Sequence, residues 1–240
     1  MTTRRQVLPT IVRSKGHLYT YGDYGPVPGV TRIAGLQDGL GGADGLMGWA
    51  VNLALDEIER ATADEFEDWP ALRARAFSAK NGARDIGSSV HAAIDRFNRG
   101  EDLGITEINA SHVAQYGAFM HRHNVKVIAS ERYVINTTIG FGGTYDLLAE
   151  VDGELALVDA KTGKAKLSQR LQLTGLSMGE LHGEDGQVPE DMPQVEAAYI
   201  LLLRPDSYEL IRHEITDADR DHFTHLVETY HRIRAWEEAA

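Results

Sequence analysis

The segment 142–164, GGTYDLLAEVDGELALVDAKTGK, holds two apolar runs on either side of the dipeptide Asp152-Gly153. Asp-Gly is a strong signal for a two-residue hairpin turn, because both central positions of that turn need a positive φ. In the register that this turn imposes, Asp146 lies directly opposite Asp159 on one face of the hairpin. The sequence therefore predicts an antiparallel hairpin with two carboxylates facing each other at its open end.

Two aspartates in this arrangement would lie about 5 Å apart and repel each other. Beside apolar residues they need a proton, a basic partner or a cation. Lys161 follows on the same face, so one alternative is a simple salt bridge between Lys161 and either aspartate at a partly exposed strand end. One lysine does not balance two acids, and the pattern therefore favours a hard divalent cation.

The spacing of apolar residues changes from about 3.6 to about 2 near residue 127, which indicates helices first and strands afterwards. Helices are predicted from Leu46, from Pro70, over 85–100, 111–123 and 167–182, and from Thr216 to the end. Strands are predicted over 127–138, 142–151, 154–162, 195–204 and 207–215. The order predicts an α/β protein with a mixed central sheet of about five strands flanked by helices, preceded by short strands or loops in the first forty residues.

Composition restricts the class of protein further. With 240 residues and 42% apolar content, one globular domain over 1–240 is expected. The sequence contains no cysteine, which excludes disulfides and a cysteine-ligated iron-sulfur cluster. No apolar run approaches the roughly 20 residues that cross a bilayer, so no membrane partner and a cytoplasmic location are expected.

The hairpin, together with the stretch GSSVHAAIDRF at 87–97, resembles the PD-(D/E)XK nuclease superfamily. Within it, the likeness is to the RecB-like exonuclease branch, which includes CRISPR-associated RecB-like exonucleases and stand-alone bacteriophage exonucleases. It runs from about Gly87 to Leu176 and is weaker over Pro28 to Ala50. The resemblance implies a restriction-endonuclease-like catalytic core over 84–240 and an N-terminal loop and helical extension over 1–83. It also implies a host-cytoplasmic location if a phage encodes the chain.

Carried over by position, the resemblance implies three metal-binding side chains, His91, Asp146 and Asp159, together with the carbonyl of Ala160. Lys161 would be the catalytic lysine. The cofactor would be Mg²⁺ or Mn²⁺, as one or two ions, and the imidazole ligand makes manganese as suitable as magnesium or more so. Without cysteine, the iron-sulfur cluster of several relatives is impossible here.

Further site residues are less closely fixed by the motif. Glu131 resembles the additional catalytic acid of this branch, although a lone strand glutamate is also a common surface residue. Gln172 resembles a glutamine that contacts the nucleic acid backbone, but Leu176 stands where an aromatic residue usually follows. Two acid-free basic segments, 73–84 and 161–170, are either solvated faces or DNA contacts. The predicted DNA-binding residues from these segments are Arg84, Lys164, Lys166 and Arg170.

The function that these expectations favour is a metal-dependent DNA exonuclease in phage or bacterial recombination, repair or replication. Its partners would be single-stranded DNA or duplex ends, and recombination or replication proteins. Two alternatives stay open: a structure-dependent endonuclease of the same fold, and a DNA-binding protein without turnover. Because the net charge is −12, the basic segments and the metal would form a positive cleft in a negative shell. Affinity for DNA would then be modest and strongly salt-sensitive.

Overall fold

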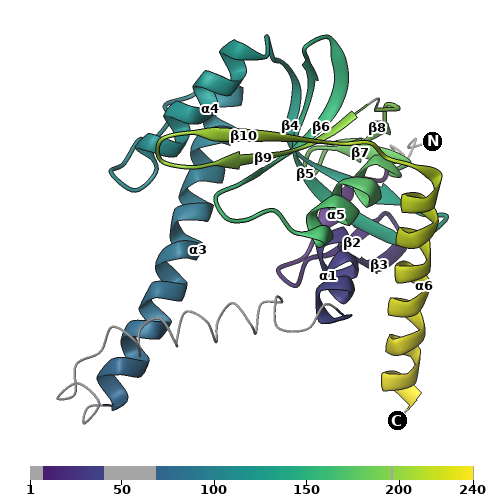
Figure 1. Ribbon diagram of the computed structural model, residues 1–240. Coiled ribbons are helices and arrows are strands. Elements are labelled where there is room, and N and C mark those ends of the chain that lie inside the picture. Colours follow the sequence, from purple (N-terminus) through teal and green to yellow (C-terminus); the bar gives the residue numbers. More distant parts are fainter. Residues whose placement is uncertain (1–7, 41–68, 196, 240) are drawn as a thin grey trace, which may run out of the picture.

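The computed structural model describes residues 8–40, 69–195 and 197–239, without the side chains of 38–40, 69–81, 83 and 84. Its strands form a three-stranded sheet, in the order β1-β2-β3, and a seven-stranded sheet, in the order β10-β9-β6-β5-β4-β7-β8 (Figure 1). The strands are β1 Ile11–Arg13, β2 Leu18–Tyr21, β3 Tyr24–Pro28, β4 Lys126–Asn136, β5 Phe141–Val151, β6 Glu154–Lys161, β7 Leu181–Gly183, β8 Glu190–Asp191, β9 Ala197–Leu203 and β10 Tyr208–His213. The helices are α1 Val30–Leu40, α3 Trp69–Arg99, α4 Ala110–Arg122, α5 Leu167–Ser177 and α6 Asp217–Ala239.

The α/β class and the mixed sheet flanked by helices are confirmed. The parallel pair β6 and β9 is the exception in an otherwise antiparallel large sheet. The predicted strand number of about five is wrong, since the large sheet has seven strands. The two additional strands, β7 and β8, have only three and two residues, too few to show an alternating pattern in the sequence.

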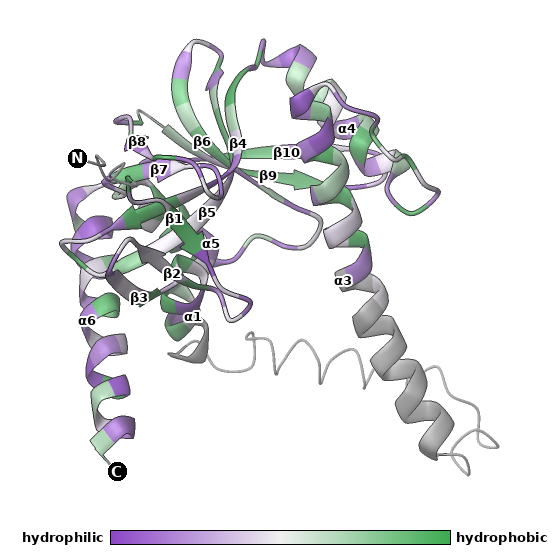
Figure 2. Ribbon diagram, turned by 180° about the vertical axis from the view of Figure 1, so that it is seen from behind, coloured by the Kyte–Doolittle hydropathy of each residue, from purple (hydrophilic) through white to green (hydrophobic). Residues whose placement is uncertain are grey.

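Helices cover both faces of the large sheet (Figure 1). On one face α1, α5 and α6 enclose an apolar cluster that contains Leu148, Leu157 and Phe223. On the other face α3 and α4 enclose a second cluster, with Val90 and Phe119 among its members. Figure 2 shows mainly hydrophobic residues along β9, which both clusters use, and a mixture of the two kinds along α6.

The central hairpin has the predicted register. Asp152 and Gly153 have φ values of 51° and 92°, as a turn with two left-handed residues requires. Backbone pairs run from Val151 opposite Glu154 to the pair of Leu147 and Val158. The paired ladder ends there, one residue before Asp146 and Asp159, so the predicted pairing of these two aspartates is not among the backbone pairs. The Asp146 carboxylate instead accepts the backbone N–H of Ala160, one residue further along β6.

The helix predictions are partly wrong. The two helices expected from Pro70 and over 85–100 are a single helix, α3, of 31 residues, because internal glycines lower helix stability without ending a helix. It ends at Arg99, and the next residue, Gly100, has the left-handed φ of 68° that is common directly after a helix. The helix expected over 167–182 stops at Ser177, and β7 follows. The helix expected from Leu46 lies outside the described residues.

The start of α6 has the predicted cap. The Thr216 hydroxyl accepts a hydrogen bond from the Asp219 amide at 3.2 Å, and the Asp219 carboxylate accepts one from the Thr216 amide at 3.0 Å. In the described ranges, no helix has the length and apolar character needed to cross a membrane.

Candidate metal centre

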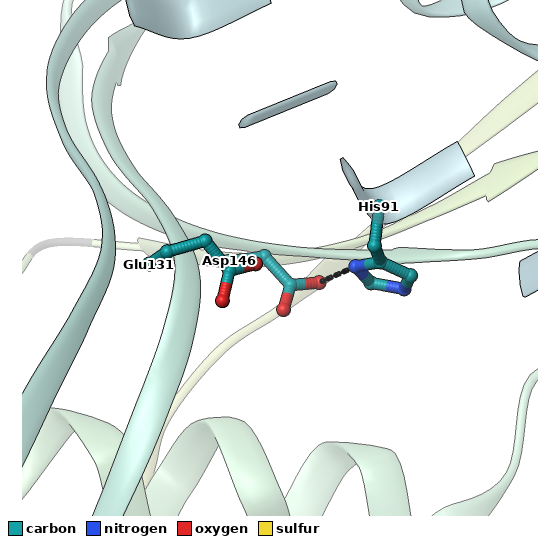
Figure 3. Close-up of side chains that lie close together, drawn as sticks. All are labelled: His91, Glu131 and Asp146. Carbon is teal, nitrogen blue, oxygen red and sulfur yellow. Dashed lines mark ion pairs between the residues drawn. The ribbon is translucent and has the colours of Figure 1, made fainter. Parts of the chain in front are cut away.

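Three side chains from three elements converge beside the open end of the hairpin (Figure 3). His91 comes from α3, Glu131 from β4 and Asp146 from β5. Each offers one ligand atom, and these atoms lie within 4.8 Å of one another. His91 Nδ1 is 3.5 Å from Asp146 Oδ2. Sequence positions 91, 131 and 146 are thus brought to a single point, where a shared ligand can bind.

At this point the alternation of side chains between the two faces of the sheet is interrupted. Tyr145 and Leu148 are three residues apart, yet both belong to the apolar cluster under α1, α5 and α6. Strict alternation along a strand would place them on opposite faces. On the neighbouring strand, Glu131 has φ 51°, a left-handed conformation that costs an ordinary residue free energy. The reversal therefore coincides with two of the three converging carboxylate and imidazole residues, Glu131 and Asp146.

Asp146 is held by the strand opposite. Its Oδ2 accepts a hydrogen bond of 2.8 Å from the backbone N–H of Ala160. The side chain is 14% exposed, so it is mostly shielded from water while its carboxylate still contacts His91. Ala160, predicted to contribute its carbonyl to the metal, is itself buried directly beside this carboxylate.

Asp159 lies deeper than the three converging residues, and its side chain is 2% exposed. Its Oδ1 accepts hydrogen bonds from Lys161 Nζ at 2.7 Å and from Gln172 Nε2 at 3.4 Å. Its Oδ2 is buried and has no hydrogen-bond partner among the described residues. The salt bridge that the sequence left open as an alternative is therefore present, and it satisfies only half of the carboxylate.

Burial and neighbouring charges raise the pKa of two acidic groups at the site, Glu131 and Asp159. Burial, together with the charges of Asp146 and Asp95, raises the pKa of Glu131 to about 8. Burial also raises the pKa of Asp159, although the Lys161 charge opposes this effect. For Lys161 burial alone would lower the pKa, but the carboxylates of Asp159 and Asp146 outweigh it and raise the pKa. The site is therefore short of positive charge.

A divalent cation fits this donor set. Carboxylate oxygens from Glu131 and Asp146 are hard ligands, which suit Mg²⁺ and Mn²⁺, and the imidazole of His91 favours the transition metal of the two. The unpartnered Asp159 Oδ2 is a buried acceptor that a cation would satisfy. The predicted ligands His91 and Asp146 are in the converging group, together with Glu131, which was predicted only as a catalytic acid. Asp159 lies outside that group.

Two neighbours of the site were not predicted. Asp95 lies one helical turn after His91 on α3, accepts a hydrogen bond from Ser130 Oγ at 3.0 Å and adds to the negative charge around Glu131. The i, i+4 spacing of His91 and Asp95 was the available signal. Arg13, at the end of β1, places a positive charge near Glu131. No local pattern connects β1 with β4, since they are more than a hundred residues apart.

The predicted DNA-binding residues differ in their surroundings. Lys164 and Lys166 are exposed on the segment between β6 and α5, and neither forms an ion pair with a described residue. Arg170 pairs with Asp219 at 2.9 Å, so its charge is already compensated. Gln172 reaches Asp159 from α5. Arg84 lies on α3, and its side chain is outside the described part of the chain.

Fold and site together define a mixed α/β protein with a candidate divalent-cation centre next to the buried Asp159 and its partly exposed ion-pair partner Lys161. No known family model matches the chain, and no curated protein matches it. The solved structure described as "Crystal structure of SSO0001" has 16% identity to it and a TM-score of 0.30, with 49% of this chain and 54% of that chain covered. The chain thus spans about half of that protein, and the likeness carries no argument about function.

Proposed function

We propose that this protein is a divalent-metal-dependent DNA exonuclease. The observation that carries the proposal is the convergence of His91, Glu131 and Asp146 within 4.8 Å at the end of the hairpin that also holds Lys161. A cation site beside a lysine combines the two charges that phosphodiester hydrolysis requires. The resemblance of the hairpin to the RecB-like nucleases supports the same assignment.

In this proposal His91, Glu131 and Asp146 would hold Mg²⁺ or Mn²⁺. A bound ion would lower the pKa of its water and polarise the phosphate. Asp146 keeps its orientation through the Ala160 amide, 2.8 Å away. His91 is 30% exposed, so the site is open to a substrate on that side.

Lys161 has a defined role in this arrangement. Asp159 holds its ammonium group at 2.7 Å, and the raised pKa keeps it protonated. A protonated ammonium donates hydrogen bonds, so Lys161 would orient the attacking water and offset phosphate charge rather than remove a proton. The water oxygen would attack phosphorus while its proton passes to bulk solvent, and the bond between phosphorus and the leaving ester oxygen would break, with that oxygen taking a proton from solvent.

The test compares end-labelled linear DNA with covalently closed circular DNA in the presence of Mn²⁺, Mg²⁺ or EDTA. An exonuclease degrades the linear substrate only, and only with a metal. Nicking of the circle would instead show the endonuclease alternative, and binding without loss of either substrate would show the DNA-binding alternative. Both 5′- and 3′-labelled strands, single and duplex, give the polarity and the strand preference.

A further inference from the structure

The β7–β8 hairpin borders the candidate metal centre from the sheet edge. β7 pairs with β4 through Tyr133 opposite Gly183 and Val134 opposite His182. This contact begins two residues after Glu131 on the same strand. The short hairpin that the sequence did not predict is therefore adjacent in the sheet to the reversal at Glu131.

A buried hydrogen bond joins this hairpin to β5. His182 Nδ1 and the Tyr145 hydroxyl are 2.8 Å apart, and these residues are 4% and 1% exposed. Tyr145 immediately precedes Asp146 in the chain. The bond therefore restrains the backbone next to Asp146 from the side opposite to Ala160.

A second connection joins the same hairpin to β4. Arg132 donates to Glu190 on β8 at 2.8 Å and to Glu184, the residue directly after β7, at 3.4 Å. His182 Nε2 lies 3.7 Å from the same Glu190. Arg132 immediately follows Glu131, and it is paired with Tyr145 across the two strands. The β7–β8 hairpin thus forms hydrogen bonds with Arg132, the neighbour of Glu131, and with Tyr145, the neighbour of Asp146.

The metal centre needs such restraint. Glu131 has a left-handed backbone, and the side-chain alternation of β5 reverses around Asp146. A costly local conformation persists only when the surrounding structure fixes it. The Ala160 amide fixes the Asp146 carboxylate, whereas the hairpin contacts fix Tyr145 and Arg132, the cross-strand pair directly beside the reversal.

We propose that the β7–β8 hairpin is a positioning element of the candidate metal centre, acting through Tyr145 and Arg132 on Asp146 and Glu131. His182 is its principal positioning residue, because its bond to Tyr145 is buried whereas the glutamate partners of Arg132 are exposed. The inference rests on the metal centre of the proposed function and adds residues outside the ligand set.

The experiment measures Mn²⁺ affinity by titration calorimetry on the full chain. His182→Leu and Tyr145→Phe each remove the bond and keep an apolar side chain of similar size. Loss of a residue that orients a ligand weakens metal binding by about tenfold or more, and this loss is expected for both variants. His182→Gln keeps a group that can bond to the Tyr145 hydroxyl and is expected to retain most of the affinity.

The chain offers a matched control. His213 on β10 is also buried, at 6% exposure, and contacts the Thr174 hydroxyl through Nε2 at 3.3 Å. His213→Leu removes a comparable bond in a part of the protein that does not adjoin the centre. It is expected to lower thermal stability as His182→Leu does while leaving the Mn²⁺ affinity unchanged.

Wild-type Mn²⁺ affinity in both His182→Leu and Tyr145→Phe would overturn the inference, as would equal weakening in His213→Leu. The readout is metal binding, so the outcome is separable from the proposed function. A wild-type protein that binds Mn²⁺ but leaves DNA intact contradicts the nuclease proposal alone. A wild-type protein that does not bind Mn²⁺ contradicts both.

Discussion

The Asp146 carboxylate accepts a hydrogen bond from the Ala160 amide at a distance of 2.8 Å, one residue beyond the last backbone pair of the central hairpin. Because the backbone pairing of β5 and β6 has ended there, the Asp146 side chain supplies the acceptor for the Ala160 N–H. This arrangement separates the two tasks of Asp146. Its oxygen satisfies the backbone, and its charge is available to a cation.

Asp146→Asn should separate these tasks experimentally. The asparagine side-chain oxygen can still accept the Ala160 N–H, so the melting temperature should stay close to the wild-type value. Loss of the negative charge should lower cleavage by about 10²-fold or more and weaken Mn²⁺ binding. Gel-based cleavage assays and calorimetry measure both quantities. Wild-type cleavage by this variant would contradict the assignment of Asp146 to the catalytic site.

Lys161→Ala should abolish cleavage and also destabilise the fold. It leaves the Asp159 carboxylate, which is 2% exposed, without its ion-pair partner. Breaking a buried pair is costly, and with Lys161 itself partly exposed the expected loss is about 2 kcal/mol in the free energy of unfolding. Urea denaturation measures it.

The double variant Asp159→Asn with Lys161→Ala removes the uncompensated charge and serves as the control. It should recover part of the lost stability without recovering cleavage. If the single variant were as stable as the wild type, the Asp159–Lys161 pair would have no structural role.

The sequence predicted the hairpin because its information is local. Asp152-Gly153 specifies the turn, and the turn sets the register as far as the pair of Leu147 and Val158. The placement of Glu131 could not be predicted in the same way. The direction of the Glu131 side chain depends on the left-handed backbone at this residue and on the pairing of β4 with β5. Neither feature leaves a pattern in the sequence around position 131.

Contacts between distant segments also determine which of the predicted DNA-binding residues keep an uncompensated charge. The sequence identified these residues only as basic. Lys166 and Arg170 belong to one basic segment, and nothing in that segment distinguishes them. In the fold, Arg170 meets Asp219 from α6, whereas Lys166 meets no described carboxylate. The β7–β8 hairpin was missed for a different reason, since five strand residues in two pieces are too few to form a periodic signal.

Lys166→Ala should weaken DNA binding more than Arg170→Ala does. An exposed cation that contacts one phosphate contributes about 0.9 to the slope of log affinity against log salt. Loss of Lys166 should reduce the slope by that amount, while loss of the paired Arg170 should change it little. Fluorescence anisotropy in the Asp146→Asn background, at several KCl concentrations, measures the slope without cleavage. Equal slopes for the two variants would contradict the prediction.

Asp219→Asn should lower stability at neutral pH only. Burial alone would raise the pKa of Asp219, but hydrogen bonds from Thr216 and Arg170 outweigh it and lower the pKa to about 2. The unfolded value is about 3.9. The folded state therefore gains stability above pH 4, about 1 kcal/mol after allowance for solvent screening, and loses it as the pH falls towards 2.

Urea denaturation of the wild type and of Asp219→Asn at pH 7 and pH 2.5 checks this prediction. The difference between the two proteins should be clear at pH 7 and small at pH 2.5. Asp217→Asn, in the same first turn of α6 but exposed, is the control and should show a smaller difference at pH 7.

Glu131 occupies a backbone conformation that glycine adopts without steric cost, because glycine has no Cβ. The residue that would best relax this position is thus one that cannot supply a carboxylate. Thermal stability and metal ligation therefore oppose each other here. In a saturation library at position 131, selection for heat resistance alone should enrich glycine and asparagine, whereas selection for DNA cleavage should retain glutamate.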